Sequence, residues 1–158
     1  MDYTTLNRSY KLCTMLYALI AEQEDTPDRD ESLDFERIHA AASMRTGYLL
    51  ALERGADAEL AACAAAIHDI GRIVTGRQKD HAANGEAPAK KLLTDSGLFS
   101  EDEIALIVAA VRNHSSKTVV GTPIEEIVKD ADVIDCYQYG MPFDRPEKET
   151  RYNAWLKK

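Results

Sequence analysis

Apolar residues recur along this chain every three or four positions, which is the spacing of one face of an α-helix. Between residues 5 and 22, for example, Leu12 and Leu16 lie one helical turn apart, and this periodicity predicts an amphipathic helix. A second helix is predicted from about Leu33 to Arg54, because Gly55 follows it and glycine commonly ends a helix.

The middle of the chain continues the helical pattern. A third helix is predicted to begin after Asp57, a residue type that caps helix N-termini, and to run through His68-Asp69 to an end at Gly71. Residues 80–94 are also predicted to be helical. We expect the chain to turn between these segments.

Two later helices have well-marked beginnings. Ser100 with Glu103, and Thr122 with Glu125, have the spacing of capping boxes, in which each side chain bonds the other residue's backbone N–H. A β-branched cluster at residues 118–120 is only a weak strand signal. The pattern as a whole is therefore helical.

The length and composition of the chain agree with this pattern. Its 158 residues, of which 45% are hydrophobic and 29% charged, are enough for one globular domain with a core. We expect an all-α fold, a bundle of about five to seven helices, in a single domain over residues 1–158. Residues 141–158 form a polar C-terminal tail in this interpretation.

Charge and hydropathy exclude several classes of partner. The formal net charge is −8, which disfavours binding to duplex nucleic acid because the phosphate backbone is itself anionic. No apolar run approaches the ~20 residues of a membrane-spanning helix, and the N-terminal residues lack the layout of a secretory signal. We expect a cytoplasmic protein that binds neither duplex nucleic acid nor a membrane. The three cysteines are widely spaced and form no CxxC pair, so we expect buried thiols rather than disulfides.

The candidate chemistry lies in the histidines. The chain contains only four of them, with a carboxylate directly after one and an acid-rich stretch near residue 130. Imidazole nitrogens and carboxylate oxygens are the ligands of catalytic zinc and of other first-row transition metals. Taken singly, each such residue is more often structural than metal-bound. A metal centre is predicted by the ordered set of His39, His68-Asp69, His81, His114 and a later aspartate.

This ordered series resembles the signature of the HD-domain superfamily of metal-dependent phosphohydrolases. The resemblance covers about residues 36–140. It implies that a first metal ion is held by His39, His68, Asp69 and Asp132. Two-metal members of the family have extra histidines that His81 and His114 match, and Asp69 would then bridge two ions.

The last aspartate of the set is not decided by the residues alone. The family places it in an Ala-Asp pair, which here is Ala131-Asp132, while Asp130 and Asp135 are alternatives. The cofactor implied is one or two divalent metal ions. The sequence does not distinguish Fe, Mn, Zn, Ni, Co or Mg.

The activity implied by the resemblance is hydrolysis of a phosphate monoester or diester. A metal ion makes its bound water more acidic and stabilises charge on the phosphate, and Asp69 would take part as the bridging carboxylate. Phosphate oxygens also favour cationic donors. Arg72, three residues after Asp69, is the first candidate and Lys117 is the second. The expected substrate is a nucleotide or another small phosphate ester.

Other functions remain open at this point. Some HD-fold proteins use a similar ligand set to hold two irons and activate oxygen, so a di-iron oxygenase is one alternative and a regulatory module is another. Asn113-His114 stands where the HD-GYP phosphodiesterases have paired histidines, and no Gly-Tyr-Pro follows, which argues against that activity. The chain also has no synthetase domain, which argues against an alarmone synthetase-hydrolase but leaves a stand-alone hydrolase open. The oligomeric state is open, with a homodimer as one alternative.

Overall fold

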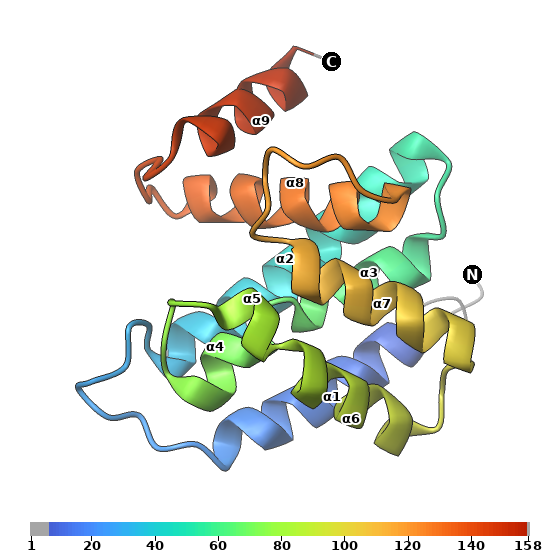
Figure 1. Ribbon diagram of the computed structural model, residues 1–158, viewed down its shortest axis with the longest axis vertical. Helices are drawn as coiled ribbons and strands as arrows, with labels where there is room; N and C mark the ends of the chain where they lie inside the picture. The colour runs from blue at the N-terminus through green and yellow to red at the C-terminus, as the bar shows by residue number, and fades with distance from the viewer. Residues whose placement is uncertain (1–6, 158) are drawn as a thin grey trace.

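The computed structural model describes residues 7–157, and every regular element in this part of the chain is a helix (Figure 1). The nine helical segments are α1 (Asn7–Ala21), α2 (Leu33–Arg54), α3 (Ala58–Ile67), α4 (Ile70–Thr75), α5 (His81–Asn84), α6 (Glu86–Ser96), α7 (Glu101–Asn113), α8 (Pro123–Gln138) and α9 (Pro146–Leu156).

The all-α prediction is confirmed. Among the described residues, seven helices have ten residues or more, which is the upper end of the predicted number, and α4 and α5 are shorter. No helix in this part of the chain is long and apolar enough to span a membrane.

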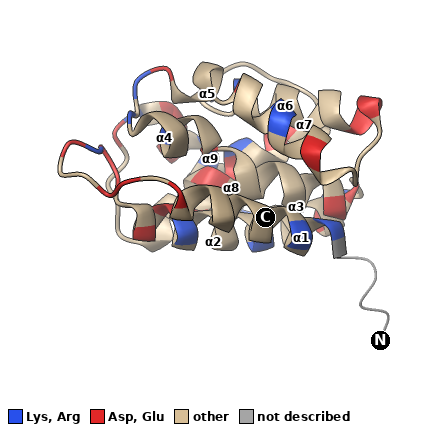
Figure 2. Ribbon diagram, turned by 90° about the horizontal axis from the view of Figure 1, so that it is seen from below, with Lys and Arg blue, Asp and Glu red and all other residues tan. Residues whose placement is uncertain are grey.

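Helix α3 lies at the centre of the bundle. It packs against α1, α2, α7 and α8, and its residues from Leu60 to Ile67 are all buried. Seen from below, α1, α2 and α3 lie along one side of the molecule and α4 to α7 along the other (Figure 2). The C-terminal end of α3 therefore leads from the first group of helices into the second.

Small residues allow α2 and α3 to approach closely. A Cβ atom at Gly47 would lie 2.8 Å from the Cβ atom of Ala65 and 3.2 Å from the backbone oxygen of Ala61. A larger side chain at any of these positions would separate the two helices. The alanine-rich sequence of α3 thus sets the distance between two elements that carry histidines.

The helix ends follow the predicted capping chemistry in most places. Both capping boxes form, at Ser100 with Glu103 and at Thr122 with Glu125. Gly55 follows α2 with φ 67°, the left-handed conformation that glycine adopts without strain. Local side-chain chemistry therefore determines where these helices start and stop.

Two predicted boundaries are wrong. Helix α3 ends at Ile67, so that His68 and Asp69 lie at the junction before α4, and Gly71 lies inside α4 instead of ending a helix. A Cβ atom at Gly71 would lie 2.0 Å from the backbone oxygen of His81, so this glycine permits contact between α4 and α5. The predicted helix over residues 80–94 is divided at Gly85 into α5 and α6.

The C-terminal tail contains a helix, α9, which packs against α8. Arg151 of α9 donates three hydrogen bonds across this contact, to the backbone oxygen of Lys117 at 2.7 Å, to Asp130 at 2.8 Å and to Glu126 at 2.9 Å. Aromatic contacts join the two helices and the loop between them, through Tyr137, Phe143, Tyr152 and Trp155.

Candidate metal centre

Five helices or helix junctions bring the candidate ligands together. They contribute His39 from within α2, His68 and Asp69 from the α3–α4 junction, His81 from the start of α5, His114 from the end of α7 and Asp132 from within α8. All four histidines and Asp69 are buried, and Asp132 is partly buried. The structure therefore places every predicted ligand at one site.

The first cluster contains His39, His68, one oxygen of Asp69 and one oxygen of Asp132. The two imidazole Nε2 atoms are 3.1 Å apart. Asp69 Oδ2 lies 3.3 Å from the Nε2 atom of His39 and 3.2 Å from that of His68. Asp132 Oδ1 lies 3.5 and 3.7 Å from the same two nitrogens.

The second cluster contains His81, His114 and the other oxygen of Asp69. Asp69 Oδ1 lies 3.2 Å from His81 Nε2 and 3.4 Å from His114 Nε2, and the two nitrogens are 2.8 Å apart. The Asp69 carboxylate thus lies between two pairs of histidines, with one oxygen facing each pair.

Each histidine is oriented by a hydrogen bond at its other ring nitrogen. The Nδ1 atoms of His68, His81 and His114 lie 2.6–2.7 Å from the backbone oxygens of Ala65, Gln78 and Val111. Because a carbonyl oxygen only accepts, Nδ1 carries the proton of the neutral imidazole, whose Nε2 lone pair is left for a cation. His39 is oriented in the same way by Asp135, at 2.5 Å.

The three acidic candidates in α8 occupy different positions. Asp132 faces the first cluster, whereas Asp135 accepts the Nδ1 hydrogen bond of His39. Asp130 forms ion pairs with Arg54 and Arg151, at 2.7 and 2.8 Å. This placement favours Asp132 as the ligand and Asp135 as the residue that orients His39.

Arg72, the first residue predicted to donate hydrogen bonds to a phosphate, lies at the site. Most of its own hydrogen bonds go to carboxylates of the protein. Its guanidinium donates to both oxygens of Glu36 at 2.7 and 3.0 Å, to Asp69 Oδ2 at 2.5 Å and to Gln78 at 2.8 Å. These bonds orient Asp69 from one side. Contact between Arg72 and a substrate stays a prediction.

Lys117, the second residue predicted to donate to a phosphate, contacts the Asp132 oxygen that is directed away from the first cluster. Its Nζ atom donates to Asp132 Oδ2 at 2.5 Å and to the backbone oxygen of Lys129 at 3.1 Å, and its side chain is completely buried. Lys117 is absent from the residues that line the cavity over the site in the described part of the chain. The geometry favours a role in positioning Asp132.

The clusters open into a cavity of about 280 Å³. Asp69, Arg72 and His81 line this cavity, together with residues from the loop before α9 and from α9 itself, among them Phe143, Arg145 and Lys148. Arg145 donates to the backbone oxygen of Ser115 at 3.2 Å, so the C-terminal segment reaches across to the residue next to His114.

Several residues at the site were not identified from the sequence. The hydroxyl oxygen of Ser115 lies 3.2 Å from His81 Nε2 and 3.4 Å from His114 Nε2. The Cys136 thiol donates to Asp132 Oδ1 at 3.4 Å, and Glu36 holds Arg72. Ser115 directly follows a predicted ligand and Cys136 is one helical turn beyond another, and this spacing is the only signal that the sequence contains for them.

The charges at the two clusters differ in their effect on the histidines. Burial disfavours protonated His68, but the adjacent Asp69 carboxylate outweighs it and raises the pKa of His68 to about 9. For His39, burial is likewise outweighed by hydrogen bonds to Asp132 and Asp135, so its pKa is well above the ordinary value. In the second cluster, burial dominates and lowers the pKa of His114 to about 4.

The donor arrangement fits a metal ion at each cluster. When each histidine is neutral with its proton on Nδ1, as a metal ligand must be, the paired Nε2 atoms face each other with lone pairs that repel, at 3.1 Å and 2.8 Å. A cation between them, together with a carboxylate oxygen, removes this repulsion. Nitrogen and carboxylate oxygen are ligands that Zn, Fe, Mn, Ni and Co accept.

Two comparisons with known proteins found a match for this chain. A family model described as HD domain matches residues 37–139, more than half of the chain. A predicted HD superfamily hydrolase from an uncultured Thermotogales bacterium has a similar structure, with a TM-score of 0.62 and 24% sequence identity over 94% of this chain and 87% of that chain. No curated protein matches.

Proposed function

The chain belongs to the HD domain family, and from this premise we propose that it is a metal-dependent phosphohydrolase acting on a small phosphate ester. The observation that carries the proposal is the position of Asp69. Its Oδ2 atom faces His39 and His68, and its Oδ1 atom faces His81 and His114. One carboxylate between two pairs of imidazoles suits a centre with two metal ions.

His39, His68 and Asp132 would hold one ion, His81 and His114 the other, and Asp69 both. Bound ions of this kind acidify water and stabilise the charge that develops on a phosphate during hydrolysis. The protein's own residues keep the ligands in place. Arg72 orients the Asp69 carboxylate, Lys117 orients Asp132, and the Nδ1 hydrogen bonds hold the imidazoles.

The cavity supports a small anionic substrate. Its volume of about 280 Å³ is at the lower end for small-molecule sites, which favours a nucleoside monophosphate or a sugar phosphate over a longer polymer. Arg145 and Lys148 are among the residues that line it, and each carries a positive charge, with Glu147 3.5 Å from Arg145 and Asp144 2.8 Å from Lys148. We therefore propose a phosphomonoester as the first class of substrate to test.

Elemental analysis of the purified protein, followed by a phosphate-release screen over nucleoside monophosphates and sugar phosphates, tests the proposal. Asp69→Asn removes a charge shared by both clusters, so we expect it to lose metal and at least about a thousand-fold in activity, since metal ions contribute several kcal/mol to such reactions. Asp95→Asn, whose exposed carboxylate pairs with Lys91, is the matched control.

Two results would contradict the proposal. One is that Asp69→Asn retains both metal and phosphate release at the level of the unaltered protein. The other is that the protein contains two irons and consumes oxygen without releasing phosphate, which would support the oxygenase alternative instead.

A further inference from the structure

The two clusters of the metal centre differ in the number of donor atoms assigned to them. The first cluster has four, two imidazole nitrogens and two carboxylate oxygens. In the second cluster His81, His114 and Asp69 supply only three. Because protein sites for divalent ions commonly use four or more ligands, the second cluster has room for a further donor.

The hydroxyl oxygen of Ser115 lies in a position that suits this donor. It is 3.2 Å from the Nε2 atom of His81 and 3.4 Å from that of His114. The Oδ1 atom of Asp69 lies at the same two distances from these nitrogens. Ligand atoms about 2.0–2.2 Å from one ion lie roughly 2.9–3.5 Å from one another at octahedral to tetrahedral angles. These spacings therefore fit a single ion.

The Ser115 hydroxyl cannot satisfy both imidazoles by hydrogen bonding. Within the described residues it forms hydrogen-bond contacts only with the two Nε2 atoms. A hydroxyl has one proton to donate, so one of the two nitrogen lone pairs stays without a donor. Its oxygen also has lone pairs of its own, and a cation can bind this oxygen together with both nitrogens.

The backbone around Ser115 keeps the hydroxyl in place. This residue directly follows His114, which caps the C-terminal end of α7. Its carbonyl oxygen accepts hydrogen bonds from the backbone N–H of Lys117 at 3.0 Å and from Arg145 at 3.2 Å. The side chain is therefore positioned before an ion arrives, which lowers the entropic cost of binding.

We propose that the Ser115 hydroxyl is a further ligand of the second metal ion, beside His81, His114 and Asp69. This inference rests on the metal centre of the proposed function, but not on the reaction. An ion that accepts more than four ligands keeps positions for water beside these donors. If the hydroxyl served only to donate a hydrogen bond to an imidazole, metal affinity would not depend on its oxygen.

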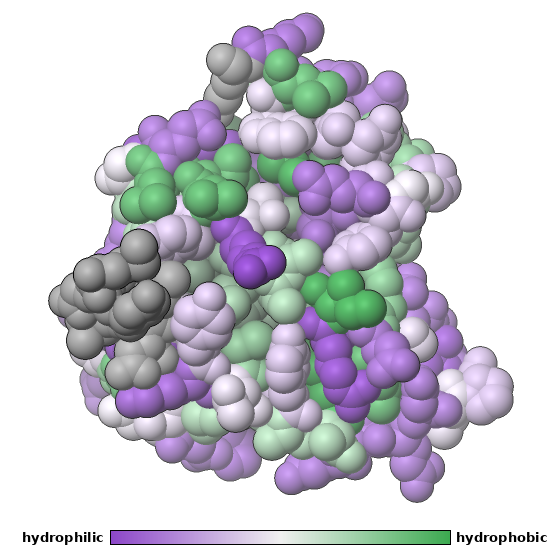
Figure 3. Space-filling model, turned by 180° about the vertical axis from the view of Figure 1, so that it is seen from behind, coloured by the Kyte–Doolittle hydropathy of each residue, from purple (hydrophilic) through white to green (hydrophobic). Residues whose placement is uncertain are grey.

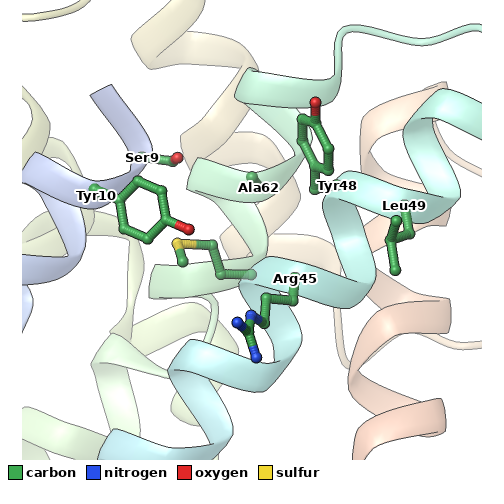
Figure 4. A pocket seen from close by; sticks show the side chains of 7 residues that line it. Ser9, Tyr10, Arg45, Tyr48, Leu49 and Ala62 are labelled. Atoms are coloured by element: carbon green, nitrogen blue, oxygen red, sulfur yellow. The ribbon is translucent and has the colours of Figure 1, made fainter. Parts of the chain in front are cut away.

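A hollow of about 370 Å³ between α1 and α2 provides a control position. Figure 3 shows the face that these two helices cover, where apolar patches lie among hydrophilic residues. Figure 4 shows the hollow itself, and no histidine or carboxylate lines it in the described part of the chain. Leu49, which is 64% exposed there, can be replaced by cysteine to measure adventitious binding of metal by a thiol.

Removal of the hydroxyl is the first test. In calorimetric titrations of the chelator-treated full chain with Co²⁺, Ser115→Ala should lower the affinity for the second ion at least about tenfold, since even partners outside the ligand shell contribute 10- to 100-fold. The affinity for the first ion should be unchanged. Ser116→Ala, which removes an exposed hydroxyl one residue further along, should behave as the unaltered protein. Circular dichroism checks that each variant is folded.

Replacement of the oxygen by sulfur is the second test, and its readout is spectroscopic. A thiol that binds a metal ion loses its proton, and a thiolate on Co²⁺ absorbs in the near ultraviolet by charge transfer. Ser115→Cys should add such a band when Co²⁺ binds, under reducing conditions. The unaltered protein, whose Cys136 thiol lies 3.4 Å from Asp132 Oδ1, gives the baseline. Leu49→Cys should add no band.

The outcomes separate this inference from the proposed function. If two ions bind but Ser115→Ala keeps the affinity of the unaltered protein and Ser115→Cys adds no band, the role of Ser115 as a ligand is overturned and the metal centre stands. If the unaltered protein binds no metal ion, both proposals fail. Weaker binding of the second ion to Ser115→Ala, or a new band in Ser115→Cys, supports the inference.

Discussion

The candidate ligand atoms owe their positions to hydrogen bonds made by the other polar atoms of the same side chains. Each imidazole donates through Nδ1 to a backbone oxygen or to Asp135, which leaves Nε2 directed toward a carboxylate. Asp69 and Asp132 are held by Arg72 and Lys117 in the same manner. At the scale of single residues, the supporting contacts are therefore as specific as the ligands.

Asp135→Asn tests the supporting role of Asp135. An amide at this position is a poorer acceptor for the Nδ1 proton of His39, so we expect the affinity for the first ion to fall about 10- to 100-fold while the second ion is unaffected. Calorimetric metal titration measures the affinities for the first and for the second ion. Asp130→Asn removes a carboxylate that pairs with Arg54 and Arg151 instead, and its affinity should equal that of the unaltered protein; a loss there would restore Asp130 as a ligand candidate.

The pKa values predict how protons compete with metal at the first cluster. In the metal-free protein the pKa of His68 is raised from 6.5 to about 9, so at neutral pH an entering ion must displace a proton. We expect the affinity of the first site to rise up to about tenfold per pH unit from pH 6.5, and to level off near pH 9. Titrations in buffers of different ionisation enthalpy count the protons released, and no release at pH 7 would contradict the prediction.

The raised pKa of His68 also affects the stability of the metal-free protein. This stability should fall with rising pH, whereas the affinity for metal should increase. Because the folded pKa of His68 lies above its unfolded value, protonation stabilises the metal-free fold below about pH 6.5. We expect this contribution to the free energy of unfolding to be lost as the pH rises through about 9. Urea denaturation of chelator-treated protein at several pH values measures the loss, and stability that increases over this range would contradict it.

At the scale of elements, the centre depends on short helices and close backbone contacts. The turn after α3 directs His68 and Asp69 to the meeting point of the two groups of helices. Helix α5, only four residues long, brings His81 to Asp69 because Gly71 lets the two backbones touch. The second cluster is therefore built on a contact that has no room for a side chain.

Gly71→Ala should break that contact. The added Cβ atom would lie 2.0 Å from the backbone oxygen of His81 and 2.5 Å from the backbone nitrogen of Gly85, so α5 must move. We expect loss of the second ion with retention of the first, and a destabilisation of about 3 kcal/mol or less if α5 can shift. Metal content and thermal unfolding measure the two effects.

Gly97→Ala is the matched control for this substitution. Gly97 has φ 63° and nothing within 4 Å of an added Cβ atom, so alanine there costs about 1 kcal/mol of stability through backbone strain alone. It should keep both ions. Equal metal loss in the two variants would show that general destabilisation, not the α4–α5 contact, explains the result.

At the scale of the whole molecule, the C-terminal segment completes the site that the other helices begin. Helix α9 is held against α8 by Arg151 and by aromatic contacts, and the segment before and within it supplies residues that line the cavity, among them Arg145, Lys148 and Asp144.

Arg145→Gln and Lys148→Gln test whether this part of the cavity lining binds the substrate. If the proposed function is correct, each should raise KM for a phosphate monoester about tenfold, as for the loss of one charge-assisted hydrogen bond, with kcat and metal content little changed. Lys91→Gln, an exposed lysine on α6, is the control. An unchanged KM in both variants would place substrate recognition elsewhere.

Local patterns in the sequence determined much of the secondary structure. The bounds of α2, both capping boxes and the left-handed glycine after α2 follow from interactions within a few residues. The errors at Gly71 and over residues 80–94 both involve a glycine. Local preference predicts a helix end at Gly71 and no break at Gly85, whereas both glycines lie at close contacts between segments that periodicity cannot reveal.

The sequence by itself also supplied the candidate ligands, because the order His39, His68-Asp69, His81, His114 and a later aspartate is a property of the chain. Only the tertiary structure decided how these residues divide into two clusters about Asp69, that Asp135 orients His39, and that Lys117 lies behind Asp132. Residue types define which chemistry is available. Distances between side chains on separate helices depend on how the helices pack, and that packing involves the whole chain.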